Sequence, residues 1–278
     1  MRTTSVAAPA KLNLHLEITG LDGSGYHTLE TVFQTLDWAD TVHVALSDQP
    51  GIRLSCAAPG VPEDERNLAH QAASAYHAAR SWPNGLDLRI DKVLPAGGGL
   101  GGGSSNAAAV LRALTQLDPE PLSPAVLATI ALQLGADVPF FLLGGCAHAT
   151  GRGEQLTPLE DPQAEPVTVL VPKLHCSTPA VFAALSDEER GPRPARGAVA
   201  WAEALDDIPS CLFNRLQAAA ARAYPELETV FAACRATGAP WLLSGSGACC
   251  FALGHHPAPD GLCAVHTHFR SRADLDRV

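Results

Sequence analysis

The sequence predicts an α+β protein built from two packed halves, each with its own sheet. Three observations support this prediction. Several segments of the first third alternate apolar and polar residues, as half-buried strands do. Helix-forming stretches follow up to about residue 135, and a second series of strand and helix patterns begins at Pro166. At 278 residues the chain is long enough for two such cores.

The strand signal is clearest in residues 12–18 (LNLHLEI), where leucines and isoleucine alternate with Asn, His and Glu. This alternation places Lys11 on the polar face of the predicted strand. The same period of two recurs at 41–46, 52–56 and 86–90, with glycine and proline between the segments. We therefore expect a strand-rich first third.

Three helices are predicted in the rest of the first half. Residues 67–80 carry small helix formers, with Asn67 in the N-cap position. A second helix is expected to begin at Ser104–Ser105, which would cap it, because the apolar residues that follow are spaced for one helix face. A third should begin with Ser123 as N-cap and end at Gly135.

A proline-bearing strip at 158–166 separates the two halves, and we place the domains at 1–155 and 156–278. The second half is predicted to contain, in order, a strand at 166–172, a polar, mobile loop at 185–197, helices around 211–223 and 225–237, and a closing strand–turn–strand at 241–254.

Charge and cysteine usage exclude several protein classes. A net charge of −10 argues against a broad surface for nucleic acid or anionic lipid. No apolar run is long enough for export or membrane insertion. The eight cysteines are scattered without a C-x-x-C, and the eleven histidines lack a complete zinc ligand set. We expect a cytoplasmic protein with reduced thiols, without a membrane or nucleic-acid partner, present as a monomer or weak homodimer.

A glycine-rich stretch, PAGGGLGGGSS, lies between a predicted strand and a predicted helix. Such a junction points several backbone N–H groups and a helix N-terminus at one place, which favours phosphate. Glycines permit positive φ and remove the Cβ atoms that would keep a phosphate away from the backbone. The sequence therefore predicts a phosphate cradle made of Pro95, Ala96, Gly97, Gly98, Gly99, Leu100, Gly101, Gly102, Gly103, Ser104 and Ser105.

This stretch has three alternative interpretations. A flexible hairpin linker would not need a helix directly behind it. A P-loop requires a lysine after the glycines, and none is present. A dinucleotide fingerprint fits Gly97-x-Gly99-x-x-Gly102, with Asp118 at roughly the required spacing. Asp118 precedes a proline in a predicted turn instead of ending a second strand, so this interpretation is the minor alternative.

The motif PAGGGLGGGSSNAA resembles the phosphate loop of the GHMP kinases, and SGSGACCFAL at 244–253 resembles their second glycine-rich turn. PAKLNLHLEITG, GYHTLETVFQTLD and LGADVPFFLLGG extend the resemblance, in the same order, over residues 9 to 253. It implies a two-domain GHMP-kinase-like fold, with an N-terminal mixed sheet and helices and a C-terminal α/β sandwich half. It also implies an ATP-dependent small-molecule kinase.

In that family the lysine of PAKLN and the aspartate of GADVP are the catalytic pair, so the resemblance assigns Lys11 and Asp137 to catalysis. A hydroxyl that attacks the γ-phosphorus of ATP needs a carboxylate to orient it and a cation to stabilise the developing charge. Of 19 lysines and arginines only three are lysines, which favours a specific use of Lys11. A helix cap for Asp137 and a surface charge for Lys11 remain the alternatives.

The resemblance also implies ATP and Mg²⁺ as cofactors. Ser105 is assigned to the metal side, with Ser104 as the alternative, because one serine can cap the helix while the other reaches a metal or phosphate. Asn67 and Lys92 match positions on the adenine side, although Asn67 serves equally well as a helix cap.

The implied substrate is a cytidine diphosphate ester of methylerythritol, phosphorylated on its 2-hydroxyl on the non-mevalonate route to isoprenoid precursors. By resemblance, Tyr26 and Phe182 sandwich the cytosine beside Thr178, His27 reads its edge, and Asn13 touches the erythritol or the phosphates. Core packing is the alternative for both aromatic residues. The alternative functions are another GHMP kinase, of homoserine or mevalonate type, and a nucleotide-binding regulator without turnover.

Overall fold

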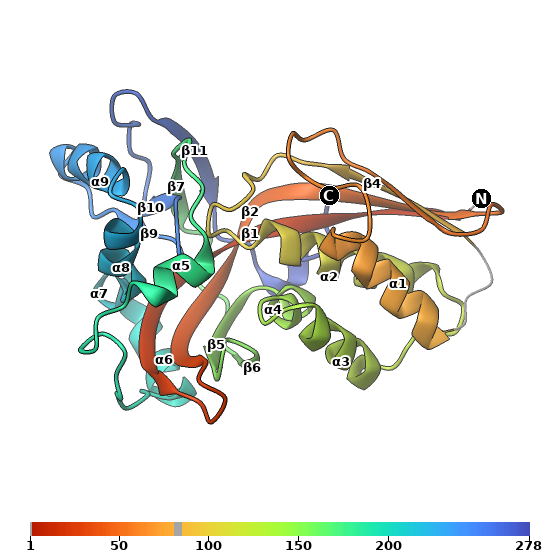
Figure 1. The fold of residues 1–278 in the computed structure, drawn as a ribbon, viewed down its shortest axis with the longest axis horizontal. Helices are drawn as coiled ribbons and strands as arrows, with labels where there is room; N and C mark the ends of the chain where they lie inside the picture. Colours follow the sequence, from red (N-terminus) through yellow and green to blue (C-terminus); the bar gives the residue numbers. More distant parts are fainter. Residues whose placement is uncertain (1, 81–84) are drawn as a thin grey trace.

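Two long antiparallel strands form the centre of the fold. In the computed structural model, which describes residues 2–80 and 85–278, β1 (Thr3–Leu21) pairs with β2 (His27–Ser47) along almost its full length. They run from the end marked N in Figure 1 to the hairpin that joins them. The strand predicted at 12–18 is thus only the middle of β1, because register shifts near Pro9 absorb that proline without ending the strand.

The first sheet has seven strands and is mixed. Its order is β3–β4–β2–β1–β8, with β5 beside β2 and β6 beside β5. The pairs β3–β4 and β1–β8 are parallel, and the remaining pairs are antiparallel. The predicted N-terminal mixed sheet is therefore confirmed. The strands not yet given bounds are β3 (Ile52–Ser55), β4 (Gly85–Asp91), β5 (Cys146–Thr150), β6 (Gln155–Pro158) and β8 (Phe213–Asn214).

Four helices lie below the long strands in Figure 1 and cover one side of this sheet. They are α1 (Leu68–Arg80), α2 (Gly102–Leu117), α3 (Pro124–Leu134) and α4 (Val138–Leu143). Helix α2 is alanine-rich on its buried side and packs against both β1 and α1. Small side chains allow this close approach, and the resulting core supports the N-terminus of α2 beside the glycine stretch.

The predicted caps of two helices are confirmed. Asn67 Oδ1 accepts a hydrogen bond from the Ala69 N–H at 2.9 Å, and Ser123 Oγ accepts one from the Val126 N–H at 3.4 Å. The prediction that Ser104–Ser105 cap α2 is wrong. That helix begins at Gly102 after a left-handed Gly101 (φ 73°), because the glycine stretch turns directly into the helix and needs no side-chain cap.

The second half is built on a four-stranded antiparallel sheet of order β11–β7–β10–β9. Its strands are β7 (Pro166–Val171), β9 (Leu242–Leu243), β10 (Cys250–Leu253) and β11 (Cys263–His268). The helices and helical turns of this half are α5 (Thr178–Ala183), α6 (Ala198–Ala204), η1 (Leu205–Asp207), α7 (Ile208–Cys211), α8 (Leu216–Ala223), α9 (Leu227–Ala236) and η2 (Arg272–Asp274).

Two features of this half differ from the sequence prediction. The helix expected at 211–223 starts only at Leu216, because Phe213–Asn214 pair in parallel with His15–Leu16 as strand β8. Strand β8 therefore links the second half to the first sheet. Strand β6 also spans the proposed division at 155/156, so the domain boundary stays a prediction.

All eight cysteines are free thiols. No helix among residues 2–80 and 85–278 combines the length and the apolar character needed to cross a lipid bilayer.

Candidate active site

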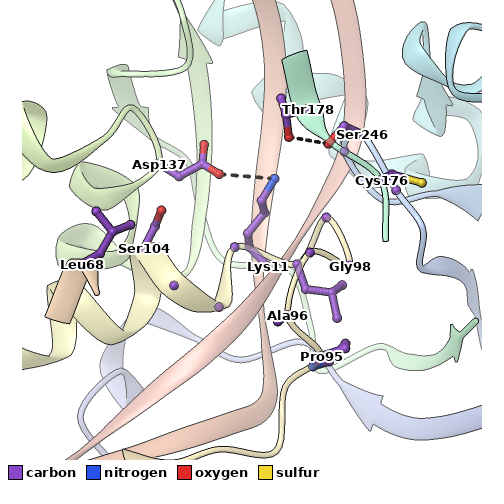
Figure 2. Close-up of a pocket in the computed structure, with 18 of the residues that line it drawn as sticks. Lys11, Leu68, Pro95, Ala96, Gly98, Ser104, Asp137, Cys176, Thr178 and Ser246 are labelled. Atoms are coloured by element: carbon purple, nitrogen blue, oxygen red, sulfur yellow. Dashed lines mark hydrogen bonds and ion pairs between the residues drawn. The ribbon is translucent and has the colours of Figure 1, made fainter. Parts of the chain in front are cut away.

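A cavity of about 550 Å³ lies where the two halves meet, with side chains from both halves in its wall (Figure 2). Most of the predicted site residues line it, although they are far apart in the sequence. They are Lys11, Asn13, Asn67, Lys92, Pro95, Ala96, Gly97, Gly98, Gly99, Leu100, Gly101, Gly102, Gly103, Ser104, Asp137, Thr178 and Phe182. Three predicted residues, Tyr26, His27 and Ser105, are not part of the wall.

The glycine stretch is held between β1 and the turn at 244–247. The Lys11 N–H donates to the Leu100 carbonyl at 3.0 Å, and the Cys249 N–H donates to the Gly98 carbonyl at 3.1 Å. Ser244 Oγ donates to the Gly99 carbonyl at 3.2 Å. These bonds use carbonyl groups of the stretch and none of the N–H groups that a phosphate cradle would need.

Glycine is required at position 99. Gly99 has φ +76°, and a Cβ atom built on it would lie 2.1 Å from the Ser244 carbonyl oxygen. Both the left-handed conformation and the close approach of two backbones exclude a larger residue.

The turn at 244–247 brings a second backbone segment against the polar residues of β1. A Cβ atom on Gly245 would lie 3.3 Å from Asn13 Oδ1 and 3.6 Å from Lys11 Nζ. Asn214 Nδ2 fixes this turn by donating to the carbonyls of Leu243 (2.7 Å) and Gly245 (2.8 Å). Sequence reasoning missed Asn214, since it fell inside a predicted helix.

Lys11 is buried, with only 5% of its surface exposed. The polar face predicted for this part of β1 is therefore not a solvent-facing surface, because the glycine stretch and the 244–247 turn cover it. Nζ donates to Asn13 Oδ1 at 2.6 Å, lies 3.8 Å from Asp137 Oδ2, and stands 4.9 Å from the centre of the Phe33 ring. Burial lowers the pKa of Lys11, and the charge of Asp137 opposes that shift.

Asp137 precedes α4 in the N-cap position, but its carboxylate makes no capping hydrogen bond. The helix-cap alternative is therefore not realised. The side chain is 34% exposed and points toward Lys11 across the cavity, as Figure 2 shows. A carboxylate that makes no capping hydrogen bond to its own helix and lies beside a buried ammonium is available to accept a proton from a bound hydroxyl.

The lowered pKa of Lys11 predicts an early alkaline limit of activity. The charged ammonium is lost as the pH rises through the lowered pKa, so turnover should decline at a pH below the ordinary lysine value of 10.5. A profile of kcat/KM against pH measures this limit. A Lys11→Arg variant, which cannot lose its proton in this range, should show lower activity without that limit. The same alkaline limit in both proteins would assign it to another group.

The two serines of α2 differ in their surroundings. Ser104 lines the cavity, and Figure 2 shows it on the same side as Asp137. Ser105 is fully buried, and its hydroxyl has no hydrogen-bond partner among the described residues. The geometry thus gives Ser104 direct access to a ligand, while Ser105 carries an unsatisfied oxygen in the same helical turn.

Lys92 and Asn67, which the resemblance places on the adenine side, are both held by bonds to other residues. Lys92 Nζ pairs with the buried Asp40 Oδ2 at 2.7 Å, and Asn106 Nδ2 donates to the same oxygen at 2.9 Å. Asn67 caps α1 and also donates to the Pro62 carbonyl at 2.7 Å. Sequence reasoning did not single out Asp40, which fixes the position of Lys92.

The dinucleotide alternative is excluded by the surroundings of Asp118. Its Oδ2 accepts a hydrogen bond from the Tyr76 hydroxyl at 3.1 Å and pairs with Arg80 Nε at 3.0 Å, so it connects α1 to α2. Asp118 is the C-cap residue of α2, and the next element along the chain is the helix α3. A ribose-binding acid at the end of a second parallel strand is therefore not present at this position.

Of the residues predicted for the base, Thr178 and Phe182 line the cavity, and His27 contacts Phe182 from outside the wall. Thr178 and Ser246 share a hydrogen bond of 2.8 Å between their hydroxyl oxygens, as Figure 2 shows. The rings of His27 and Phe182 lie 5.3 Å apart, and His27 Nε2 is buried without a partner in the described structure. Burial and, to a smaller extent, Arg190 lower the pKa of His27. A neutral His27 is thus favoured.

Family models match both halves of the chain. The model described as GHMP kinases N terminal domain matches residues 67–145, and GHMP kinases C terminal matches 196–270. The 4-diphosphocytidyl-2-C-methyl-D-erythritol kinase of Xanthomonas euvesicatoria pv. vesicatoria is 45% identical over 88% of this chain and 80% of its own length. This chain belongs to the GHMP kinase family. The predicted family and the predicted α+β fold are confirmed, and the chain is a small-molecule kinase that uses ATP.

Further comparisons agree with this assignment to the GHMP kinases. The kinase of the same name from Cupriavidus necator is 43% identical over 88% of this chain and 82% of its own length. A crystal structure titled 4-(cytidine 5'-diphospho)-2C-methyl-D-erythritol kinase shares 37% identity, with a TM-score of 0.79 over 96% of this GHMP kinase and 99% of that chain. Homoserine kinase from Cytophaga hutchinsonii shares the fold. It is 19% identical, with a TM-score of 0.71 over 98% of this chain and 95% of that chain.

Proposed function

We propose that this kinase transfers the γ-phosphoryl group of ATP to the 2-hydroxyl of 4-diphosphocytidyl-2-C-methyl-D-erythritol, a step toward isoprenoid precursors by the non-mevalonate route. The observation that carries the chemistry is the Lys11–Asp137 pair, with Nζ and Oδ2 3.8 Å apart beside the glycine stretch. The named relatives, at 43–45% identity, support the choice of substrate.

In this mechanism, the glycine stretch and the N-terminus of α2 hold the ATP phosphates. Asp137 orients the acceptor hydroxyl and takes its proton, because a loose phosphoryl-transfer transition state mainly requires position. Lys11 stabilises the negative charge that develops on the transferred group. Asn13 holds Lys11 Nζ in place at 2.6 Å and itself donates to Thr31 Oγ1 at 2.8 Å.

The residues at the start of α2 fit a magnesium ion. Mg²⁺ favours oxygen ligands and is held in most kinases by few protein groups together with the phosphates. Ser104 faces the cavity, and the Ser105 oxygen lacks any partner among the described residues. No group of three His, Cys, Asp or Glu side chains in the described chain could hold a metal ion by itself. When bound, the ion would neutralise phosphate charge.

A kinase assay tests the proposal most directly. The acceptors are the cytidine diphosphate ester, methylerythritol 4-phosphate, homoserine and mevalonate, each with ATP and Mg²⁺. The proposal expects product from the cytidine ester alone, with phosphate on the 2-hydroxyl. Turnover of homoserine or mevalonate would reassign the substrate, and ATP binding without turnover of any acceptor would favour the regulator alternative.

A Tyr26→Ala variant tests the proposed base pocket. Its ring is 61% exposed, so its removal should leave the fold intact. Base stacking contributes about 1–3 kcal/mol, so the KM for the cytidine ester should rise about tenfold, with kcat and the KM for ATP near wild type. Steady-state kinetics with each substrate varied in turn give these values. An unchanged KM for the cytidine ester would remove Tyr26 from the pocket.

A further inference from the structure

Helix α4 carries Asp137 at its N-cap, so the position of this helix decides where the carboxylate lies relative to Lys11. The helix has only six residues and packs on α2, as Figure 1 shows. A helix of this length has little stability of its own in water. Its position must therefore be fixed by contacts with the rest of the fold.

One of these contacts is made by the side chain of Phe141, which is fully buried in α4. A Cβ atom built on Gly101 would lie 2.6 Å from Phe141 Cζ and 3.2 Å from Lys11 Cγ. The phenylalanine ring and the lysine stem therefore approach the same glycine of the glycine stretch. The Phe141 N–H also donates to the Asp137 carbonyl at 3.4 Å, one helical turn earlier. Phe141 thus connects the backbone of Asp137 to the surroundings of Lys11.

Arg112 of α2 bonds to the carbonyl group of the same phenylalanine. Its side chain is only 10% exposed, and Nη1 donates to the Phe141 carbonyl at 3.1 Å. This carbonyl belongs to the last turn of α4, where carbonyl groups lack partners within the helix. The Gly145 N–H, four residues further on, donates to Thr35 Oγ1 at 3.0 Å instead. Arg112 therefore supplies the donor that the end of α4 needs.

The rest of the Arg112 guanidinium bonds to two other parts of the chain. Nη2 donates to the Ala7 carbonyl of β1, the strand that carries Lys11. Nε lies 3.1 Å from Asp276 Oδ1 in the C-terminal segment, and this ion pair compensates the buried charge. The donors of a planar guanidinium point in fixed directions. Arg112 therefore sets the spacing between the end of α4 and β1.

We propose that Arg112 is a positioning residue of this kinase, which holds α4, and with it Asp137, in register with Lys11 on β1. The inference rests on the catalytic roles proposed for Lys11 and Asp137. Arg112 is absent from the described residues that line the cavity, so it acts through Phe141 and not on a ligand. A small displacement of a reacting group can lower a rate by up to about a hundredfold. The loss of Arg112 should therefore slow the chemical step and leave substrate binding largely intact.

Arg112→Met tests the proposal, because methionine keeps an unbranched apolar stem and removes every donor. We expect kcat to fall about 10–100-fold, with the KM for ATP and for the cytidine ester within about threefold of wild type. Arg112→Lys keeps the charge beside Asp276, but one ammonium cannot reproduce the two bonds of the guanidinium, so it should restore thermal stability more than kcat. In an Asp137→Ala background, Arg112→Met should lower kcat by no more than about twofold, because no carboxylate remains to be placed.

Arg80→Met is the matched control for a loss of stability alone. Arg80 pairs with the buried Asp118 at 3.0 Å, so its bond joins α1 to the end of α2 and does not involve α4. This variant should unfold at a lower temperature and keep kcat near wild type. The proposal would be overturned by an unchanged kcat in Arg112→Met, by an equal loss of kcat in Arg80→Met, by full recovery of kcat in Arg112→Lys, or by an additive loss in the Asp137→Ala background.

Hydrogen exchange keeps this inference separate from the proposed function. In Arg112→Met the Phe141 amide should exchange about tenfold faster relative to the amides of α1, because the end of α4 is no longer held. Unchanged exchange at Phe141 would refute the inference whatever the kinetics show. If another acceptor is phosphorylated instead of the cytidine ester, the same kcat ratios are measured with it, and only the proposed substrate fails. If Asp137→Ala turns over normally, its proposed catalytic role fails, and Arg112 is left as a residue that holds α4 without acting on the reaction.

Discussion

Asp137→Ala is expected to lower kcat by about 10²–10⁴-fold and to leave ATP affinity near wild type. The carboxylate faces Lys11 and the cavity and makes no cap bond to α4, so its loss removes a proton acceptor and the ion pair with Lys11 but no hydrogen bond of the helix. The glycine stretch, which is proposed to hold the phosphates, is bonded to β1 and to the 244–247 turn, and none of these bonds involves the Asp137 side chain. Single-turnover rates and calorimetric ATP binding measure the two effects separately.

Asp137→Asn is the matched test of charge, since it keeps the size and polarity of the side chain. It should be nearly as slow as the alanine variant, because an amide cannot take the proton of the hydroxyl. Both changes remove the charge that raises the pKa of Lys11, so the residual activity should decline at a lower pH than in wild type. Normal turnover by either variant would assign proton transfer to another group.

Several features of this protein could be predicted from the sequence because they depend on residues that are neighbours in the chain. The caps at Asn67 and Ser123 were predictable because each depends only on neighbouring residues. The glycine stretch was predictable for the same reason. Only a tight junction between a strand and a helix needs so many residues without Cβ atoms. The pairing of Lys11 with Asp137 came from the resemblance to the family, because no periodicity brings residues 126 positions apart together.

The unpredicted features depend on tertiary contacts. Phe213–Asn214 lie in an apolar stretch that suits a helix, and only the exposed edge of β1 draws them into a parallel strand. Asp40 acquires its role by burial beside Lys92. Asp40 is an ordinary charged residue in the sequence, so no local signal identifies it.

Gly99→Ala is expected to damage both the stability of the fold and the binding of ATP. The new Cβ atom would lie 2.1 Å from the Ser244 carbonyl oxygen, which is backbone and cannot turn aside, in a residue with φ +76°. Strain and overpacking of this kind together cost roughly 2–6 kcal/mol. The least costly response is separation of the glycine stretch from the 244–247 turn, which breaks the Ser244–Gly99 bond and moves the phosphate cradle.

Gly103→Ala is the matched control for stability in the same segment. Gly103 lies in the first turn of α2 without a positive φ, and its nearest neighbour, Leu68, is 3.8 Å from the position of a new Cβ. Alanine there should hold or slightly raise the midpoint of thermal unfolding, since it favours the helix. For Gly99→Ala we expect a clear fall in that midpoint and at least tenfold weaker ATP binding by calorimetry. Equal midpoints for the two variants would show that the close contact between Gly99 and the 244–247 turn does not contribute to the stability of the fold.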